Sequence, residues 1–266
     1  MDTQNGYKYE VHLHTAQSSK CGSTPGEEYI AAFKAAGYDG IIVTDHFFYG
    51  NTGVDRNLPW PLFVDEFCKG YEAAKEEGDK QGFKVFFGWE ENFNNDEYLV
   101  YGLDKEWLKA HHDVLRCSQK EMLEMVHEGG GAVVQAHPFR ERGYIRNVNV
   151  HPFQCDAMEA SNFGNPPEQD ILAYNFCKDR GITMTSGSDI HNKSVIPSTT
   201  CGMLFDKPLE SIHDYVDAIK SGKGFRPLIS PDRMDPLEDA TMHLPTYLYD
   251  ENNKPRLVAK EDIFKN

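Results

Sequence analysis

The sequence lacks any segment that would cross a membrane or direct the chain to secretion. No window approaches the roughly eighteen consecutive apolar residues that a transmembrane helix needs. The first residues, MDTQNGYKYEVHLHT, contain no apolar core of a secretory signal peptide. We therefore expect a cytoplasmic protein.

Paired cysteines and an excess of basic residues are also missing. The six cysteines stand apart without a CxxC motif, which predicts free thiols rather than a disulfide framework. Lys and Arg number 27 against 42 Asp and Glu, which gives a formal charge of −15. Because polyanions bind basic surfaces, this balance predicts that neither long nucleic acid nor a membrane is a partner. The negative charge is compatible with a small phosphorylated substrate. The sequence does not define the oligomeric state.

What the sequence does contain is an alternation of short apolar runs with amphipathic segments, which is typical of βα units. The 266 residues predict seven strands, at 8–14, 40–44, 85–87, 98–101, 132–135, 157–160 and 182–186. Several are apolar throughout, as strands covered on both faces are. The pattern predicts an α/β fold, a closed or nearly closed barrel in a single domain over residues 1–266. The segment at about 227–266, rich in Pro, Asp and Asn, is expected to be irregular and to pack outside.

Capping residues mark the predicted helices. The letters TPGE at 24–27 predict a helix capped by Thr24 that runs to Gly37. The letters SQKE at 118–121 predict a capping box for a helix that glycines at 129–131 end. One continuous helix is predicted over residues 62–80.

Histidines and carboxylates follow the predicted strands where each strand ends. These runs are HLH at 12–14, TDH at 44–46, GWE at 88–90, AHP at 136–138, EASN at 159–162 and GSDIH at 187–191. Side chains two apart on a strand point the same way, so His12 and His14 project together. In a barrel of parallel strands these ends meet at one rim, where such folds place their chemistry.

Such a set of side chains predicts bound metal. Histidine and carboxylate ligands without paired cysteines favour Zn, Mn or Fe. A single buried histidine is more often structural, but the motifs HLH, TDH, GWE, AHP and GSDIH at successive strand ends favour a metal site. Their number exceeds the ligands of one tetrahedral ion, which predicts two or three divalent ions with Glu90 as a bridge.

The motifs HLHT, VTDH, GWE, QAHP and GSDIH, in this order over residues 12–191, resemble those of the PHP (polymerase and histidinol phosphatase) family of metal-dependent phosphoesterases. The resemblance implies a distorted (β/α)7 barrel with its metal site at the C-terminal ends of the strands. It also implies these metal ligands: His12, His14, His46, Glu90, His137, Asp189 and His191. We take Asp189 and His191 as candidate catalytic residues as well.

Two stretches depart from the family pattern. After HLHT, where members usually have His, Asp or Glu, the chain reads SKCG at 19–22. After EASN, where members with three metals tend to have His or Cys, it reads FGN at 163–165. Cys21 would supply the missing ligand as a thiolate and favour zinc, or it is a small packed residue in a turn; both interpretations stay open.

Neighbouring residues are candidates for contacts to substrate. Arg140 follows His137 by three residues and would clamp a phosphate with its guanidinium, and Lys20 would act as a point charge. A surface ion pair is the alternative for each. Asp45 is a candidate catalytic residue that orients the adjacent His46, or it caps a turn. Aromatic residues at 47–49 and at 60 would stack on a base or form a hydrophobic lid on Trp89.

These features predict a metal-dependent phosphoesterase that hydrolyses a small phosphate monoester or a nucleotide phosphodiester with a metal-activated hydroxide. Two alternatives stay open. One is an amidohydrolase-like enzyme that cleaves C–N or C–O bonds with similar ligands. The other is a non-catalytic metal-binding regulatory domain.

Overall fold

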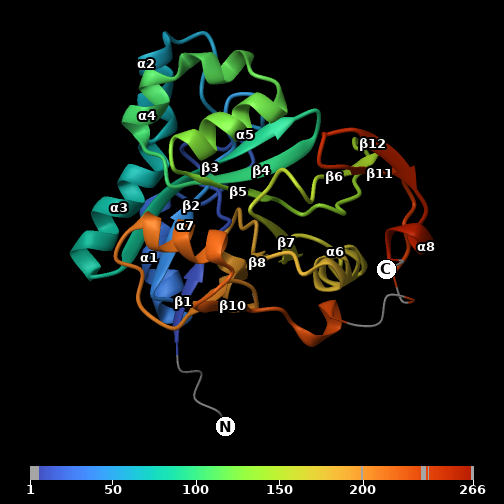
Figure 1. The fold of residues 1–266 in the computed structure, drawn as a ribbon. Helices are drawn as coiled ribbons and strands as arrows, with labels where there is room; N and C mark the ends of the chain where they lie inside the picture. Colours follow the sequence, from blue (N-terminus) through green and yellow to red (C-terminus); the bar gives the residue numbers. More distant parts are fainter. Residues whose placement is uncertain (1–5, 199, 235–237, 239, 265–266) are drawn as a thin grey trace.

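A nine-stranded sheet forms the centre of the computed structural model, which describes residues 6–198, 200–234, 238 and 240–264 (Figure 1). The strands lie in the order β10 (Phe225–Pro227), β9 (Met203–Phe205), β1 (Tyr7–Glu10), β2 (Gly40–Val43), β3 (Lys84–Phe93), β4 (Asp96–Tyr101), β5 (Ala132–Gln135), β7 (Ala157–Asn162) and β8 (Met184–Gly187). Just beyond β1 and β8, Leu13 and Ile190 form a parallel bridge. Seven strands therefore close into a nearly complete barrel, as predicted, and β9 and β10 extend it from β1.

One barrel strand runs against the others. Strand β4 is antiparallel to both β3 and β5, whereas β1, β2 and β3 run parallel, as do β5, β7 and β8. Asn94 and Asn95, with φ of 55° and 74°, form the tight turn between β3 and β4. Two residues with positive φ are typical of a two-residue hairpin turn. The start of β4, rather than its end, therefore lies at the rim where the neighbouring strands end.

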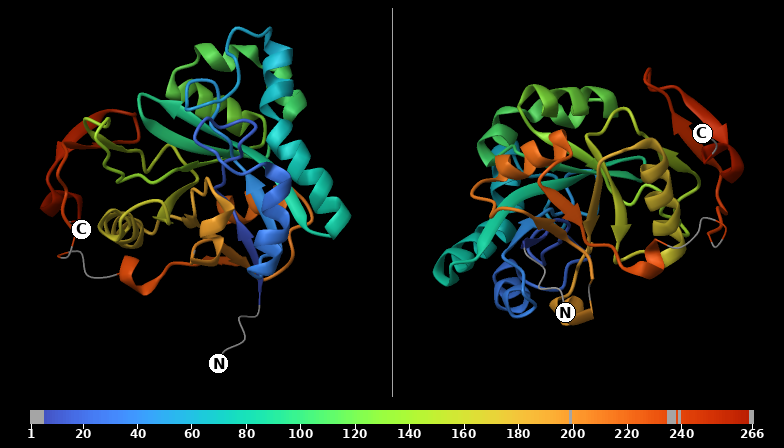
Figure 2. Two further views of the ribbon diagram at one scale, coloured as in Figure 1. Left: turned by 180° about the vertical axis from the view of Figure 1, so that it is seen from behind. Right: turned by 60° about the horizontal axis from the view of Figure 1, so that its bottom comes forward.

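Helices cover the outside of the barrel (Figures 1 and 2). They are α1 (Gly26–Ala35), α2 (Trp60–Phe67), α3 (Lys69–Gln81), α4 (Lys105–Ala110), α5 (Gln119–Glu128), α6 (Pro167–Arg180) and α7 (Ile212–Ser221). The capping box of Ser118 and Glu121 is present at α5. The helix predicted over 62–80 is instead two, which meet at Cys68. None of the described helices is long and apolar enough to cross a bilayer.

The predicted cap at Thr24 is wrong. Helix α1 begins at Gly26 after Pro25, and no side chain caps it. The Thr24 hydroxyl instead accepts a hydrogen bond of 2.9 Å from the backbone N–H of Lys193. The Thr24 hydroxyl therefore makes a long-range hydrogen bond in place of the helix cap that the local pattern predicts.

The C-terminal segment contains strands, so the prediction that it is irregular is wrong. Strands β11 (Thr246–Tyr249) and β12 (Pro255–Val258) form a hairpin, and β11 pairs in parallel with β6 (Val148–Val150). In Figure 1 this hairpin lies beside β6, and a short helix, α8 (Lys260–Ile263), follows it. The edge of β6 provides the hydrogen-bonding partners that such short strands need.

Candidate metal centre

The first half of the centre joins residues from β3 and from the segments after β1 and β8. His12 Nε2 lies 3.2 Å from Glu90 Oε1 and 3.5 Å from Asp189 Oδ1. His14 Nε2 lies 3.1 Å from Asp189 Oδ1. All four side chains are buried. The alternation of side chains along the strand therefore turns both histidines toward the same carboxylates, as predicted.

The second half consists of three further imidazoles near Glu90 and His14. His46 Nδ1 lies 2.5 Å from Glu90 Oε2, and His137 Nε2 lies 3.4 Å from Glu90 Oε1. The ring of His191 stacks on that of His14, with 4.5 Å between centroids. Glu90 thus occupies the middle of the cluster, between two groups of imidazoles.

These atoms fit bound cations. In the described part of the chain, several buried atoms of the cluster have no hydrogen-bond partner: Nε2 of His12, His14 and His137, Nδ1 of His46, and both carboxylate oxygens of Glu90. An unpaired buried polar atom costs on the order of 1–3 kcal/mol. Potential ligand atoms lie within 4.8 Å of one another in four groups: His12–His14–Glu90, His12–His137–Asp189, His14–His46–His191 and His46–Glu90–Glu97. Nitrogen and carboxylate donors of this kind suit Zn, Mn or Fe.

Further carboxylates orient the imidazoles from behind. His12 Nδ1 donates to Glu159 Oε1 at 2.9 Å, and Glu159 Oε2 accepts from the backbone N–H of His137 at 3.0 Å. Glu10 Oε1 accepts from the backbone N–H of His12 and of Ser188, at 2.8 and 2.9 Å. Because Nδ1 of His12 carries the donated hydrogen, the lone pair on its Nε2 points toward the centre of the cluster. The sequence places Glu159 at a strand end but does not indicate this role. It does not indicate Glu10 either, because Glu10 precedes the HLH motif and resembles any other strand residue.

Asp45 is bound by the loop that follows His14. Its carboxylate accepts from Thr15 N at 2.6 Å and from the hydroxyls of Thr15 and Ser19 at 2.7 and 2.6 Å. Ser19 Oγ in turn accepts from His14 Nδ1 at 3.3 Å and from the backbone N–H of His46 at 3.0 Å. Burial raises the pKa of Asp45 to about 6 despite these bonds. Asp45 therefore supports the loop at 15–19 and is linked to the backbone of His46 through Ser19.

The backbone is strained at two of the clustered residues. His137 has a φ of 29° and Asp189 a φ of 53°, a region that side-chain-bearing residues rarely adopt. Strain of this kind costs on the order of 1–3 kcal/mol and concentrates at functional sites. Both residues lie two positions beyond the end of a strand, β5 or β8, and both side chains belong to the cluster.

Opposite charges reinforce one another in the buried cluster. Burial opposes ionisation of Asp189, but the charges of Arg140 and His12 outweigh it and hold its pKa well below the usual value. Burial likewise opposes ionisation of Glu90, yet His46 and His12 hold its pKa well below the usual value. A carboxylate that stays ionised while buried is suited to a cation.

The cluster opens into a cavity of about 510 Å³. Its walls include Arg140, whose Nε donates to Asn165 Oδ1 at 2.8 Å and whose Nη2 contacts Asp189. Tyr49, 55% exposed, also lines it. Lys20 is exposed and is not among the lining residues, so the structure does not bring it to the site.

Cys21 lines the same cavity from its edge. Burial of the thiol is outweighed by hydrogen bonding from His191 and His46, which lowers its pKa to about 6. Its sulfur is not in any of the four ligand groups of the described residues. Cys21 is therefore beside the imidazoles, at the margin of the cluster.

The other aromatic candidates form a hydrophobic layer instead of lining the cavity. Phe47 packs against Trp89, Trp60 and Phe63, with ring centroids 5.9–6.0 Å apart. Phe48 packs on Phe63 at 5.0 Å. These contacts support the prediction of a hydrophobic lid on Trp89 for these residues, and leave Tyr49 as the ring that faces solvent.

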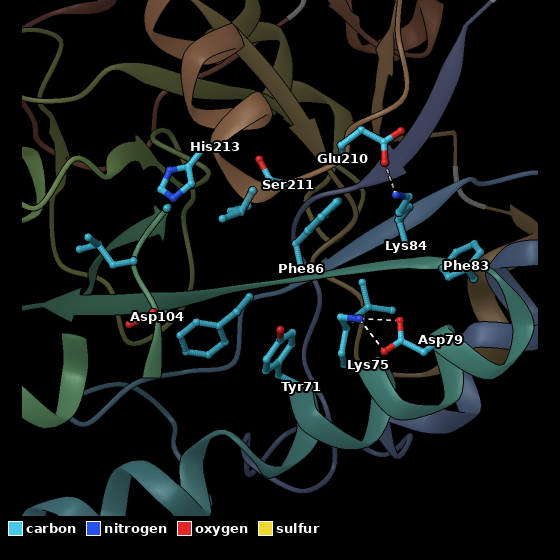
Figure 3. Close-up of a pocket in the computed structure, with 15 residues that line it drawn as sticks. Tyr71, Lys75, Asp79, Phe83, Lys84, Phe86, Asp104, Glu210, Ser211 and His213 are labelled. Carbon is cyan, nitrogen blue, oxygen red and sulfur yellow. Dashed lines mark hydrogen bonds and ion pairs between the residues drawn. The ribbon is translucent and has the colours of Figure 1, made fainter. Parts of the chain in front are cut away.

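A second cavity, of about 430 Å³, lies between α3, the start of β3 and the start of α7 (Figure 3). Lys75 pairs with Asp79 there, and Lys84 with Glu210. None of the clustered histidines lines it. Because both lysines have acidic partners, neither is an unpaired cation that an anion in this cavity could meet.

Solved structures share this fold at low sequence identity. A two-domain protein from Bacteroides vulgatus, containing a predicted PHP-like metal-dependent phosphoesterase, matches with a TM-score of 0.54 and 15% identity, over 83% of this chain and 64% of that one. The lesion-specific endonuclease Q from Pyrococcus furiosus matches with a TM-score of 0.54 and 13% identity, over 84% of this chain and 58% of that one. The chain thus spans less than two thirds of either relative. A comparison with curated proteins finds no match.

Endonuclease Q overturns one prediction made from charge. Its complex with a 27-mer duplex substrate, which carries an abasic lesion at the active site, matches with a TM-score of 0.53 and 13% identity, over 83% of this chain and 58% of that one. The prediction that long nucleic acid is excluded as a partner is therefore wrong. Net charge sums over the whole surface, whereas a nucleic-acid contact depends on the local field around one site.

The family follows from the sequence match. The family model for the PHP domain matches residues 10–145, just over half of the chain. This match includes His12, His14, His46, Glu90 and His137, while Asp189 and His191 lie beyond it. The structure brings both parts together in one cluster of potential ligands. The chain belongs to the PHP domain family.

Proposed function

We propose that this protein is a divalent-metal-dependent hydrolase of phosphate esters, acting on a small phosphate monoester or a nucleotide phosphodiester. The observation that carries the proposal is the position of Arg140 beside the buried cluster. Its guanidinium contacts Asp189 and lines the same cavity as His46 and His191. A cation fixed next to a metal site is suited to the charge of a phosphoryl group.

The proposed metal ligands are His12, His14, His46, Glu90, His137, Asp189 and His191, with Cys21 as a further candidate at the edge. Two or three ions of Zn, Mn or Fe are proposed, since the ligands exceed one coordination sphere. When bound, such ions polarise a phosphoryl oxygen and lower the pKa of water toward 7.

The protein's own groups bind and orient the substrate. Arg140 donates from Nε to Asn165 Oδ1 at 2.8 Å and from Nη2 to Asn162 Oδ1 at 3.3 Å. These bonds position its guanidinium before a phosphate binds. His191 Nδ1 donates to the carbonyl of Asp189 at 2.7 Å, which leaves the Nε2 lone pair for a cation or a proton. Asp189 and His191 are the proposed catalytic pair, and Asp45 has a positioning role through Ser19.

The test uses the full chain, purified without metal and then loaded separately with Zn²⁺, Mn²⁺ or Fe²⁺. Elemental analysis confirms loading, and released phosphate or cleaved product is measured on aryl phosphate monoesters, phosphodiesters, nucleotides, and single-stranded and duplex oligonucleotides. We expect hydrolysis of at least one phosphoester class, and a loss of about 10²-fold or more in kcat for Asp189→Asn.

Loaded protein that cleaves none of these substrates would overturn the proposal. Turnover of amides or carboxylic esters alone would favour the amidohydrolase-like alternative. Metal binding without turnover of any substrate would favour the regulatory domain. Glu128→Gln, at the exposed end of α5, is the matched control for a changed carboxylate and should leave the rate unchanged.

A further inference from the structure

We propose that Glu97 is a metal ligand of this protein, supplied by the reversed strand β4. The inference rests on the proposed function only in requiring that the cluster binds divalent metal. No motif points to Glu97, because it lies near the start of a strand whereas the other candidates lie at strand ends. The turn at Asn94 and Asn95 folds β4 back along β3, which brings the start of β4 to the rim.

The Glu97 carboxylate faces two imidazoles of the cluster. Its Oε2 lies 3.3 Å from His137 Nε2, and its Oε1 lies 3.9 Å from His46 Nδ1. Ligand atoms of Glu97, Glu90 and His46 all lie within 4.8 Å of one another. A cation among them would meet two carboxylates and an imidazole at once, with His137 next to both carboxylates.

The facing atoms lack other partners. In the described residues, His137 Nε2, His46 Nδ1 and both oxygens of Glu90 are buried without a hydrogen-bond partner. Asn92 Nδ2 donates to Glu97 Oε1 at 3.2 Å, which holds the carboxylate in place. Buried imidazole nitrogens and carboxylate oxygens that lie this close together are stabilised by a cation or by protons between them. Two carboxylates beside two imidazoles offer the charge for a divalent ion.

Solvent and ions can reach this position. The Glu97 side chain is 14% exposed and lines the 510 Å³ cavity together with His46, Arg140 and Asp189. The ligand group of Glu97 holds His46 and Glu90, whereas His12 is grouped with His14 or with His137, so the ion held by Glu97 would differ from the ion at His12. Glu97 would thus complete the coordination of the ion at His46 and Glu90.

The experiment compares metal binding by the full chain with that of Glu97→Gln, Glu97→His and the control Glu128→Gln. The glutamine keeps the size and the contact with Asn92 but removes the charge, whereas histidine restores a ligand. Bound ions are counted by elemental analysis after dialysis, and affinities for Zn²⁺ and Mn²⁺ are measured by calorimetric titration. Circular dichroism of the metal-free proteins confirms that each variant folds.

We expect Glu97→Gln to lose one ion per chain, or to bind one ion at least about tenfold more weakly. Glu97→His should recover part of that binding, and Glu128→Gln should match the parent. Equal stoichiometry and affinity in Glu97→Gln and the parent would overturn the inference, as would a parent that binds no divalent ion. Anomalous scattering that places an ion within bonding distance of Glu97 would support it independently.

This outcome is separate from that of the proposed function. If the parent binds metal and Glu97→Gln loses an ion, Glu97 is a ligand whether or not any phosphate ester is hydrolysed. If phosphate esters are hydrolysed while Glu97→Gln keeps every ion, the proposed function stands and Glu97 is no ligand.

Discussion

Among single residues, Arg140 is the one whose geometry bears most directly on substrate. Its Nε and Nη2 are held by Asn165 and Asn162, and its Nη2 contacts Asp189. Arg140→Lys keeps the charge but loses the planar fork, so we expect KM for a phosphate ester to rise about tenfold with metal content unchanged. Steady-state kinetics check this. Arg256→Lys, at an exposed position on β12, is the control, and equal effects of the two changes would contradict the role of Arg140.

His151 is a single residue that links stability to pH. It is 2% exposed, stacks on Tyr249 at 3.9 Å, and neither ring nitrogen makes a hydrogen bond of ordinary geometry among the described residues. The acidic group that faces it is Asp96, at 3.9 Å. Burial, only partly offset by Asn253, lowers its pKa from 6.5 to about 4. His151 therefore stays neutral in the folded protein at pH values where the unfolded chain would protonate it. Its contribution to the free energy of unfolding is fully present above pH 6.5 and is lost as the pH falls from 6.5 toward 4.

We expect His151→Phe to keep the stacking and to remove this dependence. At pH 7.5 its free energy of unfolding should lie within about 1 kcal/mol of the parent. At pH 5 it should exceed the parent by about 2 kcal/mol. Urea unfolding at the two pH values measures both differences. The same difference at both would contradict the assignment of the low pKa to His151.

At the scale of elements, the C-terminal segment is tied to the loop that holds Arg140. Arg233 pairs with Asp170 and donates to the carbonyl of Asn162 at 2.8 Å. Asp170 in turn accepts from Asn162 N at 2.7 Å and from Asn165 Nδ2 at 3.1 Å. A segment expected only to pack outside the barrel thus supports the two asparagines that position the guanidinium.

We expect Arg233→Met to lower the free energy of unfolding by about 3–5 kcal/mol, because it leaves Asp170 buried without its cation. Urea unfolding at pH 7.5 measures this loss. The double variant with Asp170→Asn should be more stable than Arg233→Met alone. A loss below about 1 kcal/mol would mean that the pair is not a structural link.

At the scale of the whole molecule, a bound ion would join distant parts of the chain. The candidate ligands come from β3, β4 and the segments after β1, β2, β5 and β8. The C-terminal segment from about residue 227, here called the tail, adds a parallel pairing of β11 with β6 and the Arg233 contact to α6. We propose that the barrel and the tail form one domain that unfolds as a unit.

Removal of metal should therefore destabilise the entire protein. We expect one calorimetric transition, with a Tm that falls by several degrees after chelation and recovers with added Zn²⁺ or Mn²⁺. A free ion concentration of 100 times the Kd stabilises the folded state by about 2.7 kcal/mol. Asp189→Asn should respond less to added metal. Two separate transitions would contradict the single domain, and a Tm indifferent to metal would contradict the site.

The sequence by itself determined that the histidines and carboxylates after the parallel strands meet at the rim. Apolar runs specify strands, and the histidines and carboxylates that follow them must converge once the barrel closes, because neighbouring strand ends share an edge. His12 and His14 share a face because side chains alternate along a strand. These are local rules, and composition and order along the chain are enough to apply them.

Only the tertiary structure decided the rest, because it depends on partners far apart in the sequence. The reversal of β4 brings Glu97 to the cluster, although a pattern of strand ends points away from it. Glu159 and Glu10 support His12 through contacts that no motif encodes. Asp45 is turned toward Thr15 and Ser19, and Arg233 reaches the loop after β7, because packing brings these groups together. Side-chain hydrogen bonds of this kind are set by three-dimensional neighbours, which a one-dimensional pattern does not contain.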